Sequence, residues 1–309
     1  MKKSTLVAII SSICLIVLSA GLIFYFRDKF FQPNSEISSV TEPSSAIPGN
    51  TKPYNFDYSW IEKGPYIAHA LGGFQGSTYS NSYEAFQFNY EAGQRLFEAD
   101  FSLTDDGDVV LLHTDYEWEN RIRPSDEFAF TTQNFLSFLY DGKYHTMDYR
   151  ALIDLMIEYP DIYVITDSKY LDQPSVEQEF SQIIEYAKSS SDPSVLDRVV
   201  VQIYLPEMLD WVMNLYPWHS VIYTLYQNPN WTIENVRDFA TTSGVKVITT
   251  HYSWIDTQTA STWRDAGISI AAYTIDTLDK IQELRTEYDV KLFYTNTLLS
   301  YTYRYTESK

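Results

Sequence analysis

Two carboxylates and a histidine near residue 100 form the arrangement in this sequence that is best suited to chemistry. In the apolar run 96–103, Glu98 and Asp100 occupy alternate positions, so both side chains would lie on one face of a strand. The next run, 109–114, follows after a Thr-Asp-Asp-Gly-Asp segment, which is too short for a parallel crossover and predicts a hairpin. Such a hairpin would bring His113 beside the two carboxylates. Neighbouring carboxylates repel each other unless a cation joins them, and oxygen ligands suit Mg²⁺ or Ca²⁺ better than Zn²⁺.

Three further side chains at the ends of apolar runs would complete such a site. Asp167 and Lys169 share a face at the end of the run 162–169, where they offer a third oxygen ligand and a positive charge. His69 lies near the end of the run 66–71, just before two glycines that allow a sharp turn. The plain alternatives are a solvated acidic face on an edge strand, an ordinary ion pair at a strand end and a packed, hydrogen-bonded histidine.

The apolar runs alternate with segments of helical period, which favours a parallel α/β architecture. Strands are expected at 66–71, 96–103, 109–114, 162–169, 198–204, 220–226, 245–252, 268–275 and 291–296, and helices at 81–92, 148–158, 174–188, 206–215 and 278–287. We predict a (β/α)8 TIM barrel, at whose strand ends the polar side chains would converge. The strand runs number one more than a barrel needs, and the sequence does not indicate which is extra. A doubly wound open sheet is the alternative, but no G-x-G-x-x-G motif follows a strand to support it.

The amino-terminal part of the chain has a different composition from the rest. Residues 6–26 are apolar and free of charge, and as a helix they would cover roughly the 30 Å hydrocarbon core of a bilayer. The run ends in bulky aromatic residues, unlike a cleaved signal peptide, so we expect a retained N-terminal transmembrane helix within 1–31. A flexible Ser/Pro/Thr linker at 32–57 and a barrel domain at 58–309 would follow. Basic residues around the helix lean toward a cytoplasmic amino terminus, so the prediction is a single-pass cell-membrane protein whose barrel lies outside.

Charge and cysteine content exclude several classes of function. The formal net charge of −19 would repel a phosphate backbone, so no nucleic-acid partner is expected. The single cysteine, Cys14, excludes an internal disulfide framework and any cysteine-based zinc site. Stability must therefore come from an apolar core, which 45% hydrophobic residues can supply.

Three segments carry a resemblance to a known family. They are His69-Ala70-Leu71-Gly72-Gly73, then Asn81-Ser82-Tyr83-Glu84-Ala85-Phe86, then the stretch from Phe97-Glu98-Ala99-Asp100 through Thr104-Asp105-Asp106-Gly107 to His113-Thr114-Asp115. In order and spacing they resemble the glycerophosphodiester phosphodiesterase family. The similarity continues more weakly through four later segments: Thr166-Asp167-Ser168-Lys169, Val201-Gln202, Tyr273-Thr274-Ile275 and Tyr294-Thr295-Asn296. It implies a barrel of the phosphatidylinositol-phospholipase-C-like phosphodiesterase superfamily, and a phosphodiester as substrate.

The resemblance also implies a role for each candidate side chain. His69 and His113 would form a general acid/base pair. Glu98, Asp100 and Asp167 would form a divalent metal site, and Lys169 would contact the substrate phosphate. The metal would be Mg²⁺ or Ca²⁺.

Several positions depart from the family pattern. Ala70 stands where the family usually has a phosphate-binding arginine, and Ser80 replaces a usual glutamate. Asp167 replaces a metal-binding glutamate, while Tyr273 and Asn296 replace a common tryptophan and aspartate. The sphingomyelinase D branch of the superfamily likewise lacks that arginine and uses an aspartate. The departures bear more on the substrate than on the chemistry.

The sequence thus predicts a metal-dependent hydrolase of glycerophosphodiesters, or of glycerol-phosphate linkages in a cell-surface polymer. A non-catalytic surface module that binds phosphorylated glycans is one alternative, and a sphingomyelinase D-like phospholipase acting on membrane lipids is another. Tyr116 and Trp118, in the loop after His113, are candidates for stacking on a sugar or glycerol face, or for sealing the barrel rim.

Overall fold

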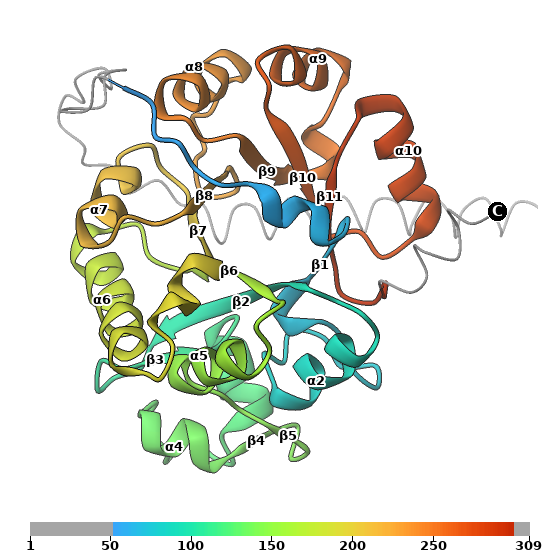
Figure 1. Cartoon of the computed structure of the whole chain (residues 1–309). Helices are drawn as coiled ribbons and strands as arrows, with labels where there is room; N and C mark the ends of the chain where they lie inside the picture. The colour runs from blue at the N-terminus through green and yellow to red at the C-terminus, as the bar shows by residue number, and fades with distance from the viewer. Residues whose placement is uncertain (1–51, 300–309) are drawn as a thin grey trace, which may run out of the picture. The chain divides into compact units, whose positions relative to one another are not determined.

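The computed structural model describes residues 52–299 of the chain (Figure 1). The predicted transmembrane helix at 1–31 and most of the linker at 32–57 lie outside this part, so both stay predictions. Within the described residues, none of the helices combines the length and the apolar character needed to cross a bilayer.

Eight parallel strands form a closed barrel in the described part of the chain, which confirms the predicted architecture (Figure 1). They are β1 (Tyr66–Ala68), β2 (Leu96–Leu103), β6 (Tyr163–Ser168), β7 (Val199–Ile203), β8 (Ser220–Thr224), β9 (Val247–His251), β10 (Ser269–Tyr273) and β11 (Leu292–Thr295). Successive strands pair with their neighbours, β11 pairs with β1, and the ring closes where Ala68 of β1 pairs with Phe97 of β2. A closed ring of parallel strands directs all its carboxyl ends to one mouth.

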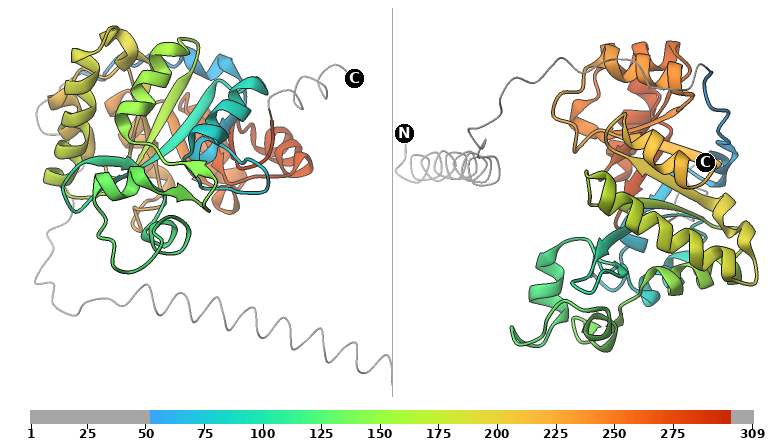
Figure 2. Two further views of the ribbon diagram at one scale, coloured as in Figure 1. Left: turned by 90° about the horizontal axis from the view of Figure 1, so that it is seen from below. Right: turned by 90° about the vertical axis from the view of Figure 1, so that its left-hand side faces the viewer.

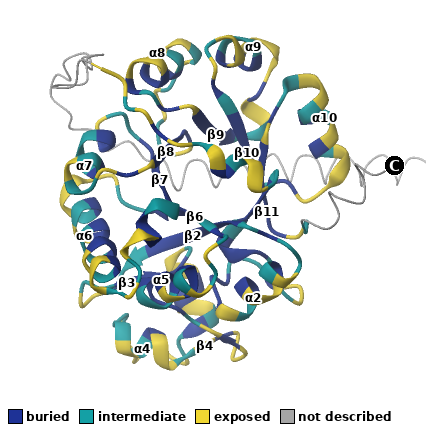
Figure 3. Ribbon diagram, viewed as in Figure 1, coloured by how far each residue is buried: buried dark blue, intermediate teal, exposed yellow. Residues whose placement is uncertain are grey.

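Helices surround the barrel and connect its strands (Figure 1). They are α2 (Tyr83–Glu91), α5 (Tyr149–Glu158), α6 (Gln173–Ser189), α7 (Met208–Leu215), α8 (Ile233–Ser243), α9 (Thr257–Asp265) and α10 (Leu278–Tyr288), with short 3₁₀ helices at η1 (Ser59–Lys63), η2 (His69–Leu71), η4 (Pro193–Arg198) and η5 (Tyr252–Trp254). Several begin at a capping side chain that accepts a hydrogen bond from the backbone three residues later, such as Asp148, Asp172 and Asp256. Figure 3 shows their exposed outer faces and the buried strands inside.

Two apolar layers hold the barrel together. The larger layer lies between the strands and the helices and includes Phe97 and Phe101 of β2. The smaller one fills the barrel interior and includes Leu96 of β2 and Ile165 of β6, with Trp60 of η1 at the end opposite the mouth. Trp60 is 1% exposed, and its indole N–H donates to Oγ of Ser220 at 2.8 Å. Alternate residues of β2 therefore face the helices and the barrel interior, as the sequence predicted.

The extra strand is β3 (Val109–Leu111), which pairs with β2 in antiparallel register through Phe101↔Leu111 and Leu103↔Val109. The predicted hairpin is confirmed, with Gly107 in its turn at a φ of 83°.

After this hairpin the chain makes an excursion before it returns to the barrel at α5. The excursion contains α3 (Asp115–Glu117), η3 (Trp118–Ile122), α4 (Thr132–Ser137), β4 (Leu139–Tyr140) and β5 (Tyr144–His145), and Figure 2 shows it projecting from the barrel. We call residues 109–147 the insertion lobe. It has a small apolar core of its own, made by Val110, Leu112, Trp118, Ile122, Phe135, Tyr140 and Tyr144.

Candidate active site

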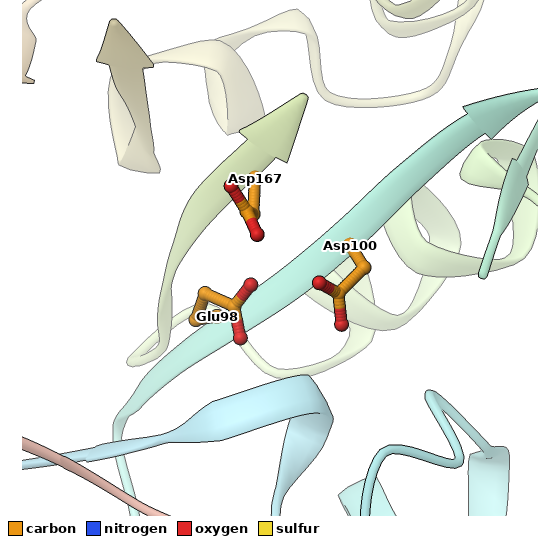
Figure 4. Close-up of side chains that lie close together, drawn as sticks. All are labelled: Glu98, Asp100 and Asp167. Carbon is orange, nitrogen blue, oxygen red and sulfur yellow. The ribbon is translucent and has the colours of Figure 1, made fainter. Parts of the chain in front are cut away.

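Three carboxylates converge at the mouth of the barrel, as Figure 4 shows. Glu98 and Asp100 extend from β2 and Asp167 from the neighbouring strand β6, where Asp100 and Asp167 stand opposite each other in register. Each offers one oxygen, and these oxygens all lie within 4.8 Å of one another. The three residues are between 0% and 7% exposed. We call them the acidic cluster.

Glu98 is the member of the acidic cluster with spare bonding capacity. Its Oε2 accepts a hydrogen bond from the backbone N–H of Ala70 at 2.6 Å, while its buried Oε1 has no hydrogen-bond partner among the described residues. Burial, together with the charges of Asp100 and Asp167, raises the pKa of Glu98 well above its usual range. An unpaired buried carboxylate oxygen beside two other carboxylates is a favourable place for a cation.

Asp100 and Asp167 are held by donors on both sides. Oδ2 of Asp100 accepts from Nδ2 of Asn81 at 2.8 Å, and its Oδ1 accepts from Nζ of Lys169 at 2.6 Å. Burial alone would raise the pKa of Asp100, but Lys169 and the two histidines outweigh it and the net shift is downward. Lys169 also contacts Oδ2 of Asp167, whose Oδ1 accepts from Nε2 of Gln202 at 2.7 Å.

Two tyrosines complete the surroundings of Asp167. The hydroxyls of Tyr204 and Tyr226 both donate to its Oδ1, the latter at 3.1 Å. Burial would lower the pKa of Lys169, yet the charges of Asp100 and Asp167 reverse the effect and raise that pKa well above its usual range. The lysine is therefore a permanent positive charge next to the acidic cluster.

The donor set fits a hard divalent cation. Three carboxylates supply oxygen ligands only, their formal charge exceeds that of the adjacent lysine, and Glu98 Oε1 lacks a hydrogen-bond partner within residues 52–299. Mg²⁺ and Ca²⁺ prefer such oxygens.

The two predicted histidines face each other beside the acidic cluster. His69 begins η2, directly after β1, and His113 follows β3 at the edge of the insertion lobe. Their ring centroids are 6.1 Å apart, and the ring of Tyr79 packs against both, at 5.1 Å from His69 and 4.5 Å from His113. Nε2 of His69 is 3.9 Å from Oε2 of Glu98. The structure thus brings all of the predicted site residues together.

The two histidines have opposite electrostatic surroundings. Burial lowers the pKa of His69, although Asp100 and Asn296 oppose that shift. Burial would also lower the pKa of His113, but the carboxylates of Glu117 and Asp100 outweigh it and raise that pKa. Oε1 of Glu117 lies 3.7 Å from Nδ1 of His113, so the effect acts through charge at a distance longer than a hydrogen bond. The lowered pKa keeps the His69 ring neutral at neutral pH, and the raised pKa makes His113 the more readily protonated of the two rings.

The first strand is shorter than predicted, and the difference shapes the site. The predicted strand 66–71 ends at Ala68, and the chain then turns through Ala70 and Leu71, which have positive φ angles of 50° and 64°. This turn aims the Ala70 backbone N–H at Glu98. Ala70 itself is fully buried. Because it is an alanine, it supplies no charge at the position where the resembled family has arginine.

Some residues of the site were not predicted as functional. Glu117, Tyr204 and Tyr226 carry no local signal, because each reaches the site through the fold rather than through a sequence pattern. Gln202 lies in a segment of the weaker family resemblance, but the sequence assigned it no role. Of the two loop aromatics, Trp118 is 5% exposed in the core of the insertion lobe, so it seals the lobe and is not available for stacking. Tyr116 is 62% exposed.

Fold and site together define a (β/α)8 barrel with an acidic cluster and a histidine pair at the carboxyl ends of its strands. No family profile and no curated sequence matches the chain. Solved structures do match in fold. An Oleispira antarctica phosphodiesterase in complex with the product sn-glycerol-3-phosphate is 17% identical with a TM-score of 0.62, covering 79% of this chain and 96% of its own.

Two further solved structures are glycerophosphodiester phosphodiesterases. The Parabacteroides distasonis protein is 16% identical with a TM-score of 0.60, and covers 80% of this chain and 99% of its own. The Thermotoga maritima protein is 16% identical with a TM-score of 0.54, covering 80% and 98%. At these identities the comparisons establish that this chain has the barrel fold of those enzymes.

Proposed function

We propose that this protein is a metal-dependent phosphodiester hydrolase that acts on glycerophosphodiesters or on glycerol-phosphate linkages of a cell-surface polymer. The observation that carries the proposal is the acidic cluster lying next to two histidines, with a lysine beside it, at the mouth of the barrel. The fold shared with glycerophosphodiester phosphodiesterases supports it, and so does the glycerol phosphate bound to one of them.

The chemistry follows from the charges and the two proton carriers. Glu98, Asp100 and Asp167 would hold Mg²⁺ or Ca²⁺, which supplies positive charge to a non-bridging phosphate oxygen. Lys169 adds a second positive charge, and it matters more here because Ala70 supplies none. The neutral His69 takes the proton of the attacking hydroxyl, and the protonated His113 gives a proton to the leaving oxygen. The opposite pKa shifts of the two rings suit this division.

The predicted anchor gives the proposal its location. A transmembrane helix within 1–31 and a linker at 32–57 would tether the barrel to the outer side of the cell membrane. Glycerol-phosphate polymers of the cell surface would then be within reach.

The test uses the full chain in detergent, with glycerophosphocholine and a glycerol-phosphate polymer as substrates and Mg²⁺ or Ca²⁺ added. We expect product release that EDTA abolishes and that falls by at least about 100-fold in Glu98→Gln and His69→Ala, since metal and acid/base contributions are each of that order. Turnover that survives EDTA would refute the metal dependence. Ligand binding without turnover in the wild type would refute the assignment as a hydrolase.

One observation favours a second candidate, a phospholipase acting on membrane lipids. Large apolar side chains are exposed in the segments that follow the carboxyl ends of strands, on the same face as the acidic cluster: Tyr116, Leu171, Tyr226, Trp254 and Leu278. Exposed apolar groups around a mouth favour contact with a lipid surface. This candidate would be supported over the first if the protein hydrolysed phospholipid in liposomes faster than it hydrolysed glycerophosphocholine.

A further inference from the structure

A chain of hydrogen bonds separate from the acidic cluster ends on His69. Its members follow three neighbouring strands, with His69 after β1, Asn296 after β11 and Asp276 after β10. Nδ1 of His69 lies 3.0 Å from Oδ1 of Asn296. Nδ2 of Asn296 in turn donates to Oδ2 of Asp276 at 3.1 Å. Asp276 therefore reaches the histidine through the asparagine.

The position of Asn296 is fixed from several directions. Ala68 and Thr295 pair in register, so the residues that follow them, His69 and Asn296, lie side by side. The backbone N–H of Asn296 donates to Oδ1 of Asp276 at 2.7 Å, and its carbonyl oxygen accepts from the N–H of Gly73 at 2.6 Å. A Cβ at position 73 would clash with that carbonyl oxygen, so glycine is required for this approach. Asn296 is 9% exposed and has little freedom to move.

Asp276 determines which end of the asparagine amide faces the histidine. A carboxylate only accepts hydrogen bonds, so the donor Nδ2 of Asn296 must face Asp276 and the acceptor Oδ1 must face His69. Oδ1 can only accept, so the ring nitrogen that it contacts, Nδ1 of His69, must carry the proton. Nε2 then has the free lone pair of the neutral ring, and Nε2 is the nitrogen that faces Glu98.

We propose that Asp276 is a positioning residue that acts through Asn296, holding the proton of His69 on Nδ1 and leaving Nε2 as the proton acceptor. The catalytic consequence rests on the proposed function, whereas the position of the proton does not. During attack the O–H bond of the nucleophile breaks, its proton goes to Nε2, and its electron pair forms the new P–O bond. The bond between phosphorus and the leaving oxygen breaks, its electron pair stays on that oxygen, and the oxygen takes a proton from His113. The imidazolium so formed keeps its hydrogen bond from Nδ1 to Asn296, so the ring does not have to turn.

The direct test is the protonation pattern of the His69 ring, measured by two-dimensional ¹H–¹⁵N NMR of the full chain in detergent, with His69→Ala used to assign the signals. Wild type should show the proton on Nδ1. Asp276→Ala frees the Asn296 amide to rotate and present Nδ2, so a substantial share of the proton should move to Nε2. The swap D276N combined with N296D places a donor at 276 and an acceptor at 296, and should restore the proton to Nδ1.

The kinetic test compares kcat and KM. We expect Asp276→Ala to lower kcat by about 10- to 100-fold, the range for losing a group that orients a functional histidine, with KM changed less than about twofold. The swap should recover most of the loss. Asp256→Ala is the matched control, because Asp256 also precedes a barrel helix. Its Oδ1 accepts from the backbone N–H of Thr259 at 2.8 Å and caps α9, and it does not contact His69 or Asn296. It should lower stability without changing kcat.

The outcomes separate this proposal from the proposed function. A wild type without phosphodiesterase activity refutes the function, while the NMR comparison still decides the role of Asp276. An active wild type whose Asp276→Ala variant keeps both the Nδ1 proton and kcat overturns the positioning role. If Asp276→Ala does not fold, the isosteric swap decides: a proton on Nε2 in that variant overturns the proposal.

Discussion

His69 and His113 face each other across the barrel mouth with their ring planes at 86° and their centroids 6.1 Å apart. The two rings come from different parts of the fold: His69 from η2, directly after β1, and His113 from the insertion lobe. Tyr79 packs against both rings, so contact fixes their separation. A phosphoryl group that bridged the rings would have a proton acceptor on one side and a proton donor on the other.

His113 should be required for turnover and not for folding. Replacement by asparagine removes the acid that protonates the leaving oxygen, so kcat should fall by about 10²- to 10⁴-fold. The matched control is His145→Asn, because His145 pairs with Glu84 at the surface, away from the site. Steady-state assays of the two variants at the pH optimum make the comparison. Equal activities would show that His113 takes no part in the reaction.

Glu117 should set the alkaline limit of activity. Its carboxylate helps to raise the pKa of His113, which has to be protonated to act as the acid. Glu117→Gln keeps the shape and removes the charge, so the pKa of His113 falls and the alkaline limb of the kcat profile moves to lower pH. Rates measured from pH 5 to pH 10 reveal the shift. A limb that stays in place would mean that another group controls it.

Lys169 should have opposite effects on cation affinity and on turnover. Its ammonium lies 2.6 Å from Asp100 and competes for the same oxygens as a metal ion. In Lys169→Met we expect tighter Mg²⁺ or Ca²⁺ binding but slower hydrolysis. Because removal of one partner from a buried ion pair costs about 3–5 kcal/mol, the variant should melt earlier without metal and gain more in Tm when metal is added.

Calorimetric titration with the cation tests this prediction, together with thermal melts recorded in its presence and in its absence. Lys291→Met is the control, because Lys291 pairs with Asp289 at the exposed end of α10. Weaker cation binding in Lys169→Met would contradict the competition.

Glu179 should make the protein less stable as pH rises. It is fully buried on α6, where Oγ of Ser168 donates to its Oε2 at 3.2 Å, and burial raises its pKa to about 8. The folded state thus binds a proton that the unfolded state releases near pH 4.5. The free energy of unfolding should therefore fall between these two values, by at most about 1.4 kcal/mol per pH unit.

Glu179→Gln stays neutral, so it should match wild type near pH 5 and exceed it at pH 8. Denaturant titrations at both values measure the difference, and Glu185→Gln, at an exposed position of the same helix, should show none. A wild-type stability that does not change over this interval would mean that the carboxyl is ionised in the native state.

The sequence was informative where a pattern is local. Alternation along β2 predicted that Glu98 and Asp100 face the barrel interior, because a strand places every second side chain on the same side. A short turn predicted the β2–β3 hairpin, since so few residues cannot make a crossover. The strand positions followed from runs of β-branched and aromatic residues.

What the sequence could not provide depends on contacts between distant segments. Asp276 and His69 are connected only after three strands have been placed side by side, and Gln202 meets Asp167 across 35 positions. The early turn at Ala70 lets its backbone N–H donate to the buried carboxylate of Glu98, which lies on the next strand along the chain. The predicted roles of the six site residues, the anchor and its orientation stay predictions.

The separate core of the insertion lobe has a consequence for how activity fails. Proteins open locally in cooperative units, and a unit with few apolar residues opens at a lower free energy than the whole domain. The lobe carries His113 and Glu117, whereas the acidic cluster belongs to the barrel. On warming, the lobe would lose its order first. The general acid His113 would then leave its place beside a cation site that is still intact. Heat inactivation would then precede global unfolding, and amide exchange in residues 109–147 would be faster than in the strands well below the melting temperature.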